Sequence, residues 1–287
     1  MPREYAILKA AKRVLNEEDA KKVIKGMDII GDIAVIKIPD KLLHKRFELA
    51  KALLESIPTI KVVLRKASTI KGEYRLMDLE WLAGEERFET IYREHGCTFK
   101  VDLSKVFFTP RLSGERIRIA NLVREGEVII NMFAGIGTYS IIIAKHAKPR
   151  EVYSIDINPD AFKLMKINIK LNKVEDKVIP ILGDAREVIV EKYFNTADRV
   201  LMPLPELSLK YIPYAVKSLK NACGWIHPYE FIKVAKGENP VEKVAKIYEK
   251  ELEKMDVKFS IVQGRKVGEV APRKYRVVLD IKIEGYE

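Results

Sequence analysis

The stretch Val128-Ile129-Ile130-Asn131-Met132-Phe133-Ala134-Gly135-Ile136-Gly137-Thr138-Tyr139-Ser140 determines which fold this chain can adopt. A short apolar run ends in two glycines, and an apolar segment, residues 140–147, follows. This pattern predicts a buried strand, a tight turn and the start of a helix. Glycine lets a ligand approach the backbone closely, and a helix N-terminus offers unpaired N–H groups. We therefore expect a nucleotide-like ligand at this turn.

The residues around the turn indicate which nucleotide it binds. A dinucleotide-binding turn has a third glycine where this chain has Ser140, so Gly135 and Gly137 alone also fit an ordinary strand-to-helix turn. The next predicted strand ends in Asp156, about 20 residues further on, where a carboxylate binds ribose hydroxyls. A third strand ends in Asp184. Two acids without a pyrophosphate cradle suit an adenosine without phosphates, which points to S-adenosylmethionine rather than a nicotinamide dinucleotide.

Composition narrows the class of protein. The 287 residues suffice for two domains, 47% of them are hydrophobic, and no apolar run approaches the length of about 18 residues that a membrane span needs. The N-terminus lacks the apolar core of a signal peptide, and the two cysteines lie far apart in sequence. We therefore expect a cytoplasmic protein. The formal charge of +11 favours a nucleic-acid partner, although charged surface networks of the thermophile type explain the composition equally well.

Two different patterns divide the chain into domains. Residues 1–103 combine helical periodicity with short strands, including a hairpin around Gly31-Asp32, and predict a small α+β domain. From residue 104 to 287 strands and helices alternate, which predicts an α/β domain whose parallel sheet is covered on both faces. The last two strands lack a helix between them and should form an antiparallel hairpin at one edge. Strands are expected at residues 59–65, 89–92, 97–101, 106–108, 127–131, 151–155, 178–182, 198–202, 223–227, 257–262 and 275–283.

Few residues outside the glycine turn have an evident chemical role. Pro203 and Pro205 stiffen the segment after the fourth strand of the α/β domain, where a planar substrate would be positioned or where the strand simply ends in a turn. Glu115 begins a helix, where an acid acts as a base or complements the helix dipole. Arg75 reads most simply as a surface arginine. The histidines and cysteines have no spacing suited to a metal site.

As a set, the motifs resemble those of the archaeal and eukaryotic tRNA guanine-37 N1-methyltransferases. The resemblance covers about residues 27–285 and implies a Rossmann-like class I S-adenosylmethionine-dependent methyltransferase sheet. The matching segments are Gly72-Glu73-Tyr74-Arg75, Leu79-Glu80, Ala83-Gly84, Phe107-Phe108-Thr109-Pro110-Arg111-Leu112, Glu115-Arg116, Asn131-Met132-Phe133-Ala134-Gly135-Ile136-Gly137, Asp156-Ile157-Asn158-Pro159, Asn168-Ile169-Lys170-Leu171-Asn172-Lys173, Asp198-Arg199-Val200-Leu201-Met202 and Ala271-Pro272-Arg273-Lys274-Tyr275.

The resemblance also implies roles for individual residues. The glutamate matching Glu115 takes the N1 proton of guanine, and the arginine matching Arg75 stabilises negative charge on guanine O6, which agrees with the weak acidity of that N–H. The partner implied is the anticodon stem-loop of tRNA, bound by a protein expected to be a monomer without a metal. The implied cofactor pocket comprises Phe107, Arg116, Phe133, Gly135, Ile136, Asp156, Ile157, Asp184, Ala185, Pro203 and Pro205.

The chain departs from the family pattern in three places. The family often has Asn-Leu-Pro or Asn-Pro-Pro where this chain has Pro203-Leu204-Pro205, so a substrate contact through that amide is absent. We do not expect the additional N-terminal domain with which many members read the tRNA elbow, so recognition should depend on the anticodon stem-loop. Asn131 stands where aspartate is commoner.

Three alternatives remain. A wybutosine-pathway relative transfers the aminocarboxypropyl group of the same cofactor at position 37, but its pattern differs from this chain at residues 109–112, 156–159 and 203–205. A second variant methylates C7 of the tricyclic imidazopurine intermediate, and the residues do not exclude it. A non-catalytic RNA-binding protein with a relict cofactor fold would not need Glu115, Asp156 and Asp184 together.

Overall fold

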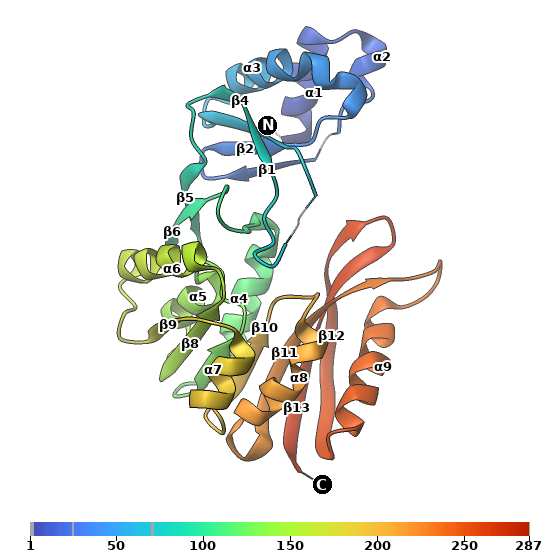
Figure 1. Cartoon of the computed structure of the whole chain (residues 1–287). Helices are drawn as coiled ribbons and strands as arrows, with labels where there is room; N and C mark the ends of the chain where they lie inside the picture. The colour runs from blue at the N-terminus through green and yellow to red at the C-terminus, as the bar shows by residue number, and fades with distance from the viewer. Residues whose placement is uncertain (1–2, 25, 70–71, 287) are drawn as a thin grey trace. The chain divides into compact units, whose positions relative to one another are not determined.

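The computed structural model describes residues 3–24, 26–69 and 72–286, and the chain forms two compact units, Met1–Pro110 and Arg111–Glu287 (Figure 1). This division falls later than the expected boundary after residue 103. The connecting residues belong to the first unit because of two aromatic contacts there. The ring of Phe108 lies edge-on to that of Tyr92, with 4.9 Å between centroids, and the guanidinium of Arg75 lies 4.8 Å from the ring centroid of Phe107.

The first unit is an α+β domain built on a four-stranded sheet with the strand order β1-β2-β3-β4. The predicted hairpin around Gly31-Asp32 is confirmed, because β1 and β2 pair antiparallel. The apolar faces of α1 and α3 pack on this sheet in a shared core. The elements of the unit are α1 (Arg3–Val14), α2 (Glu17–Ala20), β1 (Met27–Ile30), β2 (Ile33–Ile36), the 3-10 helix η1 (Asp40–Lys45), α3 (Arg46–Ser56), β3 (Val62–Lys66), β4 (Leu79–Gly84) and a separate two-stranded sheet of β5 (Glu89–Glu94) and β6 (Cys97–Asp102).

The strand predicted over residues 106–108 is wrong. The chain turns directly after β6, because the carboxylate of Asp102 accepts hydrogen bonds from the backbone N–H and the hydroxyl of Ser104. The N–H of Val106 then donates to the carbonyl of Asp102. An aspartate that binds the backbone two residues on favours a turn over a strand.

The second unit contains a seven-stranded sheet with the order β12-β13-β11-β10-β7-β8-β9. The neighbouring strands from β11 through β10, β7 and β8 to β9 pair parallel, whereas β12 and β13 add an antiparallel hairpin at one edge. The predicted parallel sheet with its edge hairpin is confirmed. The strands are β7 (Val128–Asn131), β8 (Glu151–Asp156), β9 (Val178–Leu182), β10 (Arg199–Met202), β11 (Cys223–Lys233), β12 (Val257–Ala271) and β13 (Lys274–Tyr286).

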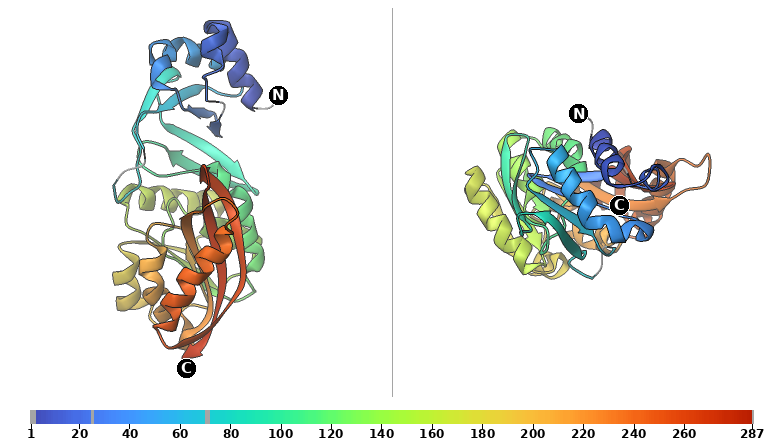
Figure 2. Two further views of the ribbon diagram at one scale, coloured as in Figure 1. Left: turned by 90° about the vertical axis from the view of Figure 1, so that its right-hand side faces the viewer. Right: turned by 90° about the horizontal axis from the view of Figure 1, so that it is seen from above.

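Helices cover both faces of this sheet. Val277 and Leu279 of β13 belong to the core under α8 and α9, whereas Asp280 points to the opposite face and binds Arg118 of α4. In the left view of Figure 2, α9 lies in front of the red edge hairpin. None of the helices in the described part of the chain is long and apolar enough to cross a membrane. The helices are η2 (Pro110–Leu112), α4 (Ser113–Leu122), α5 (Thr138–His146), α6 (Pro159–Asn172), α7 (Ala185–Lys192), α8 (Ser208–Ser218), η3 (Lys220–Ala222) and α9 (Pro240–Glu253).

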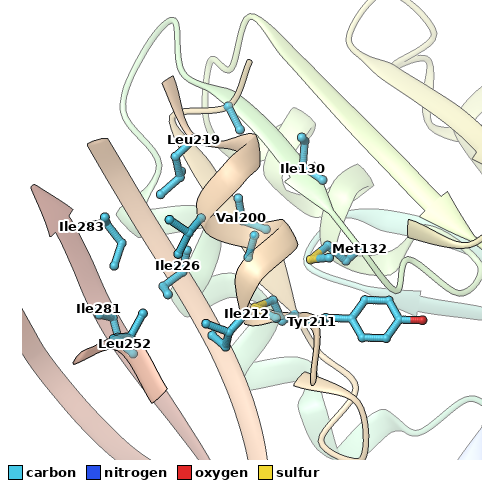
Figure 3. Close-up of a cluster of buried hydrophobic side chains, with 14 of the residues drawn as sticks. Ile130, Met132, Val200, Tyr211, Ile212, Leu219, Ile226, Leu252, Ile281 and Ile283 are labelled. Carbon is cyan, nitrogen blue, oxygen red and sulfur yellow. The ribbon is translucent and has the colours of Figure 1, made fainter. Parts of the chain in front are cut away.

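The core of the second unit holds the central strands in register. Figure 3 shows Ile130, Val200 and Ile226 from three neighbouring strands beside Ile212 of α8 and Leu252 of α9. All five side chains are fully buried. Each contributes about 1.5–3 kcal/mol through its removal from water. The parallel strands therefore form a rigid base from which the following turns project.

Strand β11 is longer than the sequence predicts. Its register with β10 ends at the pair Met202 and Pro228, and beyond this point it pairs with β13 alone up to Lys233. The expected strand ends at residue 227, directly before Pro228. Likewise β12 continues past residue 262 to Ala271. We call residues 229–233, 265–271 and 274–278 the β11–β13 extension.

Glu230 of this extension gives the stability of the protein a pH dependence. Its side chain is largely buried, and burial raises its pKa to about 6, although hydrogen bonds from the N–H of Phe231 and the hydroxyl of Tyr248 act in the opposite direction. Because the folded pKa exceeds the usual value of 4.5, the stabilisation is present below pH 4.5 and is lost as the pH rises through about 6.

We expect the substitution Glu230→Gln to remove this loss, which amounts to at most about 2 kcal/mol. Urea unfolding of both proteins below pH 4.5 and at about pH 7 measures it, because the variant should be the more stable protein only at the higher pH. Parallel pH dependences of the two proteins would contradict the assignment.

Candidate active site

The turn after β7 has the backbone geometry of a ligand-binding turn. Gly135 and Gly137 have φ angles of +55° and +88°, in the left-handed region that favours glycine. A Cβ atom at Gly137 would lie 3.0 Å from the side chain of Met165, whereas at Gly135 it would meet nothing within 4 Å. Gly137 is therefore required by its φ angle, and a side chain there would also crowd Met165. Gly135 is required by its φ angle, and the open space beside it leaves room for a ligand.

Asp156 at the end of β8 binds the same turn. One of its carboxylate oxygens accepts a 2.6 Å hydrogen bond from the N–H of Gly135, and the other accepts a 2.9 Å bond from the N–H of Asn158. Burial raises the pKa of Asp156, and these two backbone donors partly offset that effect. A carboxylate has about four lone-pair sites, so the fixed group still has acceptor capacity for hydroxyl groups.

Ser140, which takes the place of a third glycine, belongs to a buried polar cluster. Its hydroxyl accepts hydrogen bonds from the amide of Asn131 at 3.2 Å and from the hydroxyl of Ser154 at 2.7 Å. All three side chains are fully buried. Asn131 thus has a structural role, because its amide donates to Ser140 and its carbonyl oxygen lies within 3.4 Å of the N–H of Phe133. A third glycine could not make these bonds.

Asp184 lies after β9, at the start of α7. It caps the N-terminus of α7 and accepts hydrogen bonds from Arg186 and from the hydroxyl of Tyr211. Burial tends to raise the pKa of Asp184, but these hydrogen bonds lower it overall. The ring of Tyr211 packs against that of Phe133, with centroids 5.1 Å apart. An acid beside aromatic rings suits a heteroaromatic ring with N–H donors.

The structure brings together most of the predicted cofactor residues. Asp156 is the last residue of β8, and the other members of this group lie in the turns or helix starts that follow β7, β8 and β9, which we call the cofactor turns: Phe133, Gly135, Ile136, Ile157, Asp184 and Ala185. Asn168 of α6, which the sequence analysis lists in a matching segment without giving it a role, donates a 3.1 Å hydrogen bond to the carbonyl of Ile136 and so holds the first of these turns. A fixed acid at the end of β8, an open glycine and an aromatic wall fit an adenosyl group.

The segment after β10 is also fixed. The hydroxyl of Ser208 donates to the carbonyl oxygens of Met202 and Leu204, at 2.7 and 2.9 Å. Pro205 is buried, whereas Pro203 is partly exposed. The segment is a rigid loop at the same edge of the sheet as the cofactor turns, and Pro203 presents a ring there without a polar side-chain group.

Glu115 is a buried carboxylate in the first turn of α4, with 4% of the residue exposed. Arg118 donates to both of its oxygens, at 2.8 and 2.9 Å, and the hydroxyl of Tyr229 donates to one of them at 2.7 Å. A further cation, Arg265, lies 3.8 Å away. Three hydrogen bonds thus fix the orientation of a single buried carboxylate.

The Glu115 site is anchored by a chain of buried polar groups. Arg118 also pairs with Asp280, and Asp280 lies 2.7 Å from Nδ1 of His227. Because Arg199 lies 2.7 Å from Nε2 of His227 and can only donate, Nε2 accepts and Nδ1 donates to Asp280. Burial lowers the pKa of His227, in agreement with this neutral form, while the donors around Asp280 outweigh its burial and hold its pKa well below the usual range.

Sequence reasoning did not find this chain of contacts, because its members are far apart in sequence. Arg118 and Asp280 are separated by 162 residues, and Tyr229 and Glu115 by 114. Each residue alone looked like an ordinary strand or helix residue. Only the Glu115-Arg116 motif pointed to this helix.

The remaining predicted site residues lie in two different units. Arg116 is buried in α4, with its guanidinium 6.0 Å from the ring centroid of Tyr139. Arg75 and its neighbour Phe107 belong to the first unit, where Arg75 has a left-handed φ of +57°. A left-handed non-glycine residue is uncommon, and such residues cluster at functional sites. The joint action of Arg75 and Phe107 with the residues of the second unit stays a prediction.

The described part of the chain contains no group of three or more His, Cys, Asp and Glu side chains that could hold a metal ion. The described residues do provide one oriented carboxylate, Glu115, and a sheet edge with room for an adenosyl group.

Comparison with known protein families gives two matches. The family described as TRM5/TYW2 methyltransferase domain matches residues 90–258, and that described as TYW2 N-terminal domain matches residues 7–87. The tRNA 4-demethylwyosine(37)-methyltransferase Taw21 of Saccharolobus solfataricus is 40% identical over 92% of this chain and 96% of its own length. The tRNA (guanine(37)-N(1))-methyltransferase Trm5b of Pyrococcus abyssi is 41% identical over 90% of this chain and 74% of its own length.

Two solved structures, one of a Trm5 and one of a TYW2 protein, are also similar to this chain. The complex of aTrm5 with tRNALeu superposes with a TM-score of 0.84 at 36% identity, covering 99% of this chain and 80% of that one. TYW2 of M. jannaschii in complex with AdoMet has a TM-score of 0.67 at 30% identity, covering 91% of this chain and 100% of that one. The predicted methyltransferase fold with its smaller N-terminal domain is thereby confirmed.

Proposed function

Because the chain belongs to the TRM5/TYW2 methyltransferase family, we propose that it transfers a methyl group from S-adenosylmethionine to N1 of guanine-37 in tRNA. The observation that carries this proposal is the buried carboxylate of Glu115, which Arg118 and Tyr229 hold in a fixed orientation. It lies in the same compact unit as the adenosyl-binding turns. A weakly acidic N–H at the target atom requires such a base.

Different residues of the cofactor turns bind different parts of S-adenosylmethionine. Asp156 accepts from the ribose hydroxyls, as acids at this position of parallel sheets do. Asp184 with the wall of Phe133 and Tyr211 accommodates the adenine. When bound, the cofactor supplies an electrophilic methyl group. The AdoMet complex of a solved relative at 30% identity supports this assignment.

The remaining residues act on the guanine. Glu115 takes the proton from N1 as the new bond from N1 to the methyl carbon forms and the bond from that carbon to sulfur breaks. Arg75 stabilises the negative charge that develops on O6, since a positioned cation lowers the energy of such a charge most where water is excluded. The rigid loop of Pro203 and Pro205 restricts the positions open to the base, which makes the alignment of N1 with the methyl group less costly.

A second candidate is methylation of 4-demethylwyosine at the same position. The Saccharolobus relative with that name is as similar to this chain as the N1-methyltransferase of Pyrococcus, at 40% against 41% identity. Pro203 also provides no side-chain amide to bind the edge of a guanine. A tricyclic base with a larger apolar surface fits a proline as well as guanine does.

The product distinguishes the candidates directly. Purified protein is incubated with labelled S-adenosylmethionine and either an unmodified tRNA transcript or tRNA carrying 4-demethylwyosine, and the nucleosides are separated by mass. We expect N1-methylguanosine from the transcript. Methylation of the wyosine substrate alone would establish the second candidate, and an aminocarboxypropyl product would overturn both.

A further inference from the structure

The strand register sorts the residues of the β11–β13 extension onto two faces. Tyr229 pairs with Val278, Phe231 with Arg276 and Lys233 with Lys274, so the members of each pair point to the same side. Tyr229 donates to Glu115, which identifies this side as the one next to the candidate base. We call it the Glu115 face.

The Glu115 face carries only positive charge. The register also places Arg265 and the small residues Gly268 and Ala271 on it. None of the described residues that lie on this face of the extension is acidic, and four are basic. The acids of the extension, Glu230 and Glu269, lie on the opposite face because they are out of phase with these pairs. The four basic residues of the Glu115 face are Lys233, Arg265, Lys274 and Arg276.

Two cations on this face are restricted by an aromatic ring, and one of them, Lys274, lies opposite another lysine. The charged groups of Lys274 and Arg276 lie 5.3 and 5.1 Å from the ring centroid of Phe231. Lys233 stands directly opposite Lys274, and like charges at such a position destabilise a strand pair. Cation–π contacts restrict the two side chains, so less freedom is lost when they bind an anion. A polyanion would also relieve the repulsion between the two lysines.

The position of this face relates it to the reaction. Strand β11 is parallel to β10, so its far end lies at the sheet edge from which the cofactor turns project. The five residues past Pro228 extend this edge by about 16 Å. At its base Arg265 lies 3.8 Å from Glu115. A nucleotide whose base reaches Glu115 therefore brings its neighbouring phosphates to this face.

We propose that the Glu115 face of the β11–β13 extension is an RNA-backbone surface, on which Lys233, Lys274 and Arg276 bind the phosphates next to the modified nucleotide. This inference rests on the proposed function only in taking RNA as the substrate. It assigns contacts to phosphate, which position a nucleic acid without reading its sequence. Binding through this surface should thus tolerate changes in the neighbouring bases and depend strongly on salt.

The test compares two lysines of the same hairpin. Lys274 lies over Phe231 on the Glu115 face, and Lys266 lies over Tyr275 on the other face, each with its ammonium about the same distance from a ring, 5.3 and 5.4 Å. The full-length variants Lys274→Ala and Lys266→Ala are titrated into a labelled anticodon stem-loop RNA with G37 over a series of salt concentrations. Fluorescence anisotropy measures the affinity.

We expect Lys274→Ala to weaken binding about fivefold to tenfold at ~0.1 M salt and to reduce the slope of log K against log[salt] by about 0.7–0.9. Lys266→Ala should bind like the parent protein. Lys233→Ala serves as a second variant and should reproduce Lys274→Ala. The melting temperatures of both should equal or exceed that of the parent, because each removes one of two opposed charges.

Equal affinities of Lys274→Ala, Lys233→Ala and the parent would overturn the proposal, and so would an equal loss in Lys266→Ala. A failure of the proposed function can be distinguished from a failure of this proposal. If the nucleoside product is not N1-methylguanosine but the two face variants bind RNA more weakly than the control, the surface is supported and only the product is wrong.

Discussion

Replacing Glu115 by Gln should lower the rate of methyl transfer by about 10²–10⁴-fold, the range that a positioned general base contributes. Glutamine has nearly the same shape, but it cannot accept the N1 proton. Its amide also faces Arg118, which retains Asp280 as a carboxylate partner. The site should therefore stay folded, with the loss in kcat rather than in cofactor binding.

Single-turnover transfer of labelled methyl to the stem-loop RNA measures this loss. Asp280→Asn is the matched control, because it removes the other carboxylate that binds Arg118 but leaves the base intact. We expect the control to lose much less turnover than Glu115→Gln. Equal losses would mean that the buried ionic contacts, rather than proton transfer, account for the effect, and full activity of Glu115→Gln would remove Glu115 from the mechanism.

Replacing Asp156 by Ala should raise the dissociation constant for S-adenosylmethionine by about 100-fold or more. Hydrogen bonds to a charged acceptor contribute about 1.5–3 kcal/mol each, and two ribose hydroxyls would lose their acceptor. The substitution also releases the N–H groups of Gly135 and Asn158, which the carboxylate holds in place. Both effects reduce cofactor affinity.

Isothermal titration with S-adenosylmethionine measures the affinity directly, without RNA. Asp160→Ala is a suitable control, since Asp160 is an acid of the same turn that binds Lys163 at 3.3 Å rather than the glycine turn. The control should bind the cofactor as tightly as the parent. An unchanged affinity in Asp156→Ala would exclude this carboxylate as the ribose acceptor.

The cofactor side of the site could be predicted because its signals are local. Gly135, Asp156 and Asp184 each follow a short apolar strand directly, and parallel strands bring their carboxyl ends to one edge. The hydrophobic periodicity of helices and strands is also clear in these segments. A strand, a turn and an acid within a few residues suffice to place each group.

The substrate side could not be predicted in the same way. Glu115 binds Tyr229 directly and is linked to Asp280 through Arg118. Tyr229 and Asp280 both lie far from Glu115 in the sequence. The length of β11 depends on pairing with β13, a distant segment that carries the strand past its expected end at residue 227. The strand predicted at residues 106–108 failed for the converse reason, because a local aspartate turn prevailed over β-branched and aromatic propensity.

The strand order of the second unit separates two tasks along one sheet. The cofactor turns follow β7, β8 and β9, whereas the proline loop and the basic extension follow β10 and β11 on the other half. The two halves come from different stretches of the chain, residues 128–186 and 199–286. Exchanging the second stretch between members of the family should thus redirect the methyl group to another atom of the nucleotide, provided that Tyr211, which packs against Phe133 and donates to Asp184, is kept. In this sheet, β7, β8 and β9 hold the methyl donor, and the other strands can change with the nucleotide that accepts the methyl group.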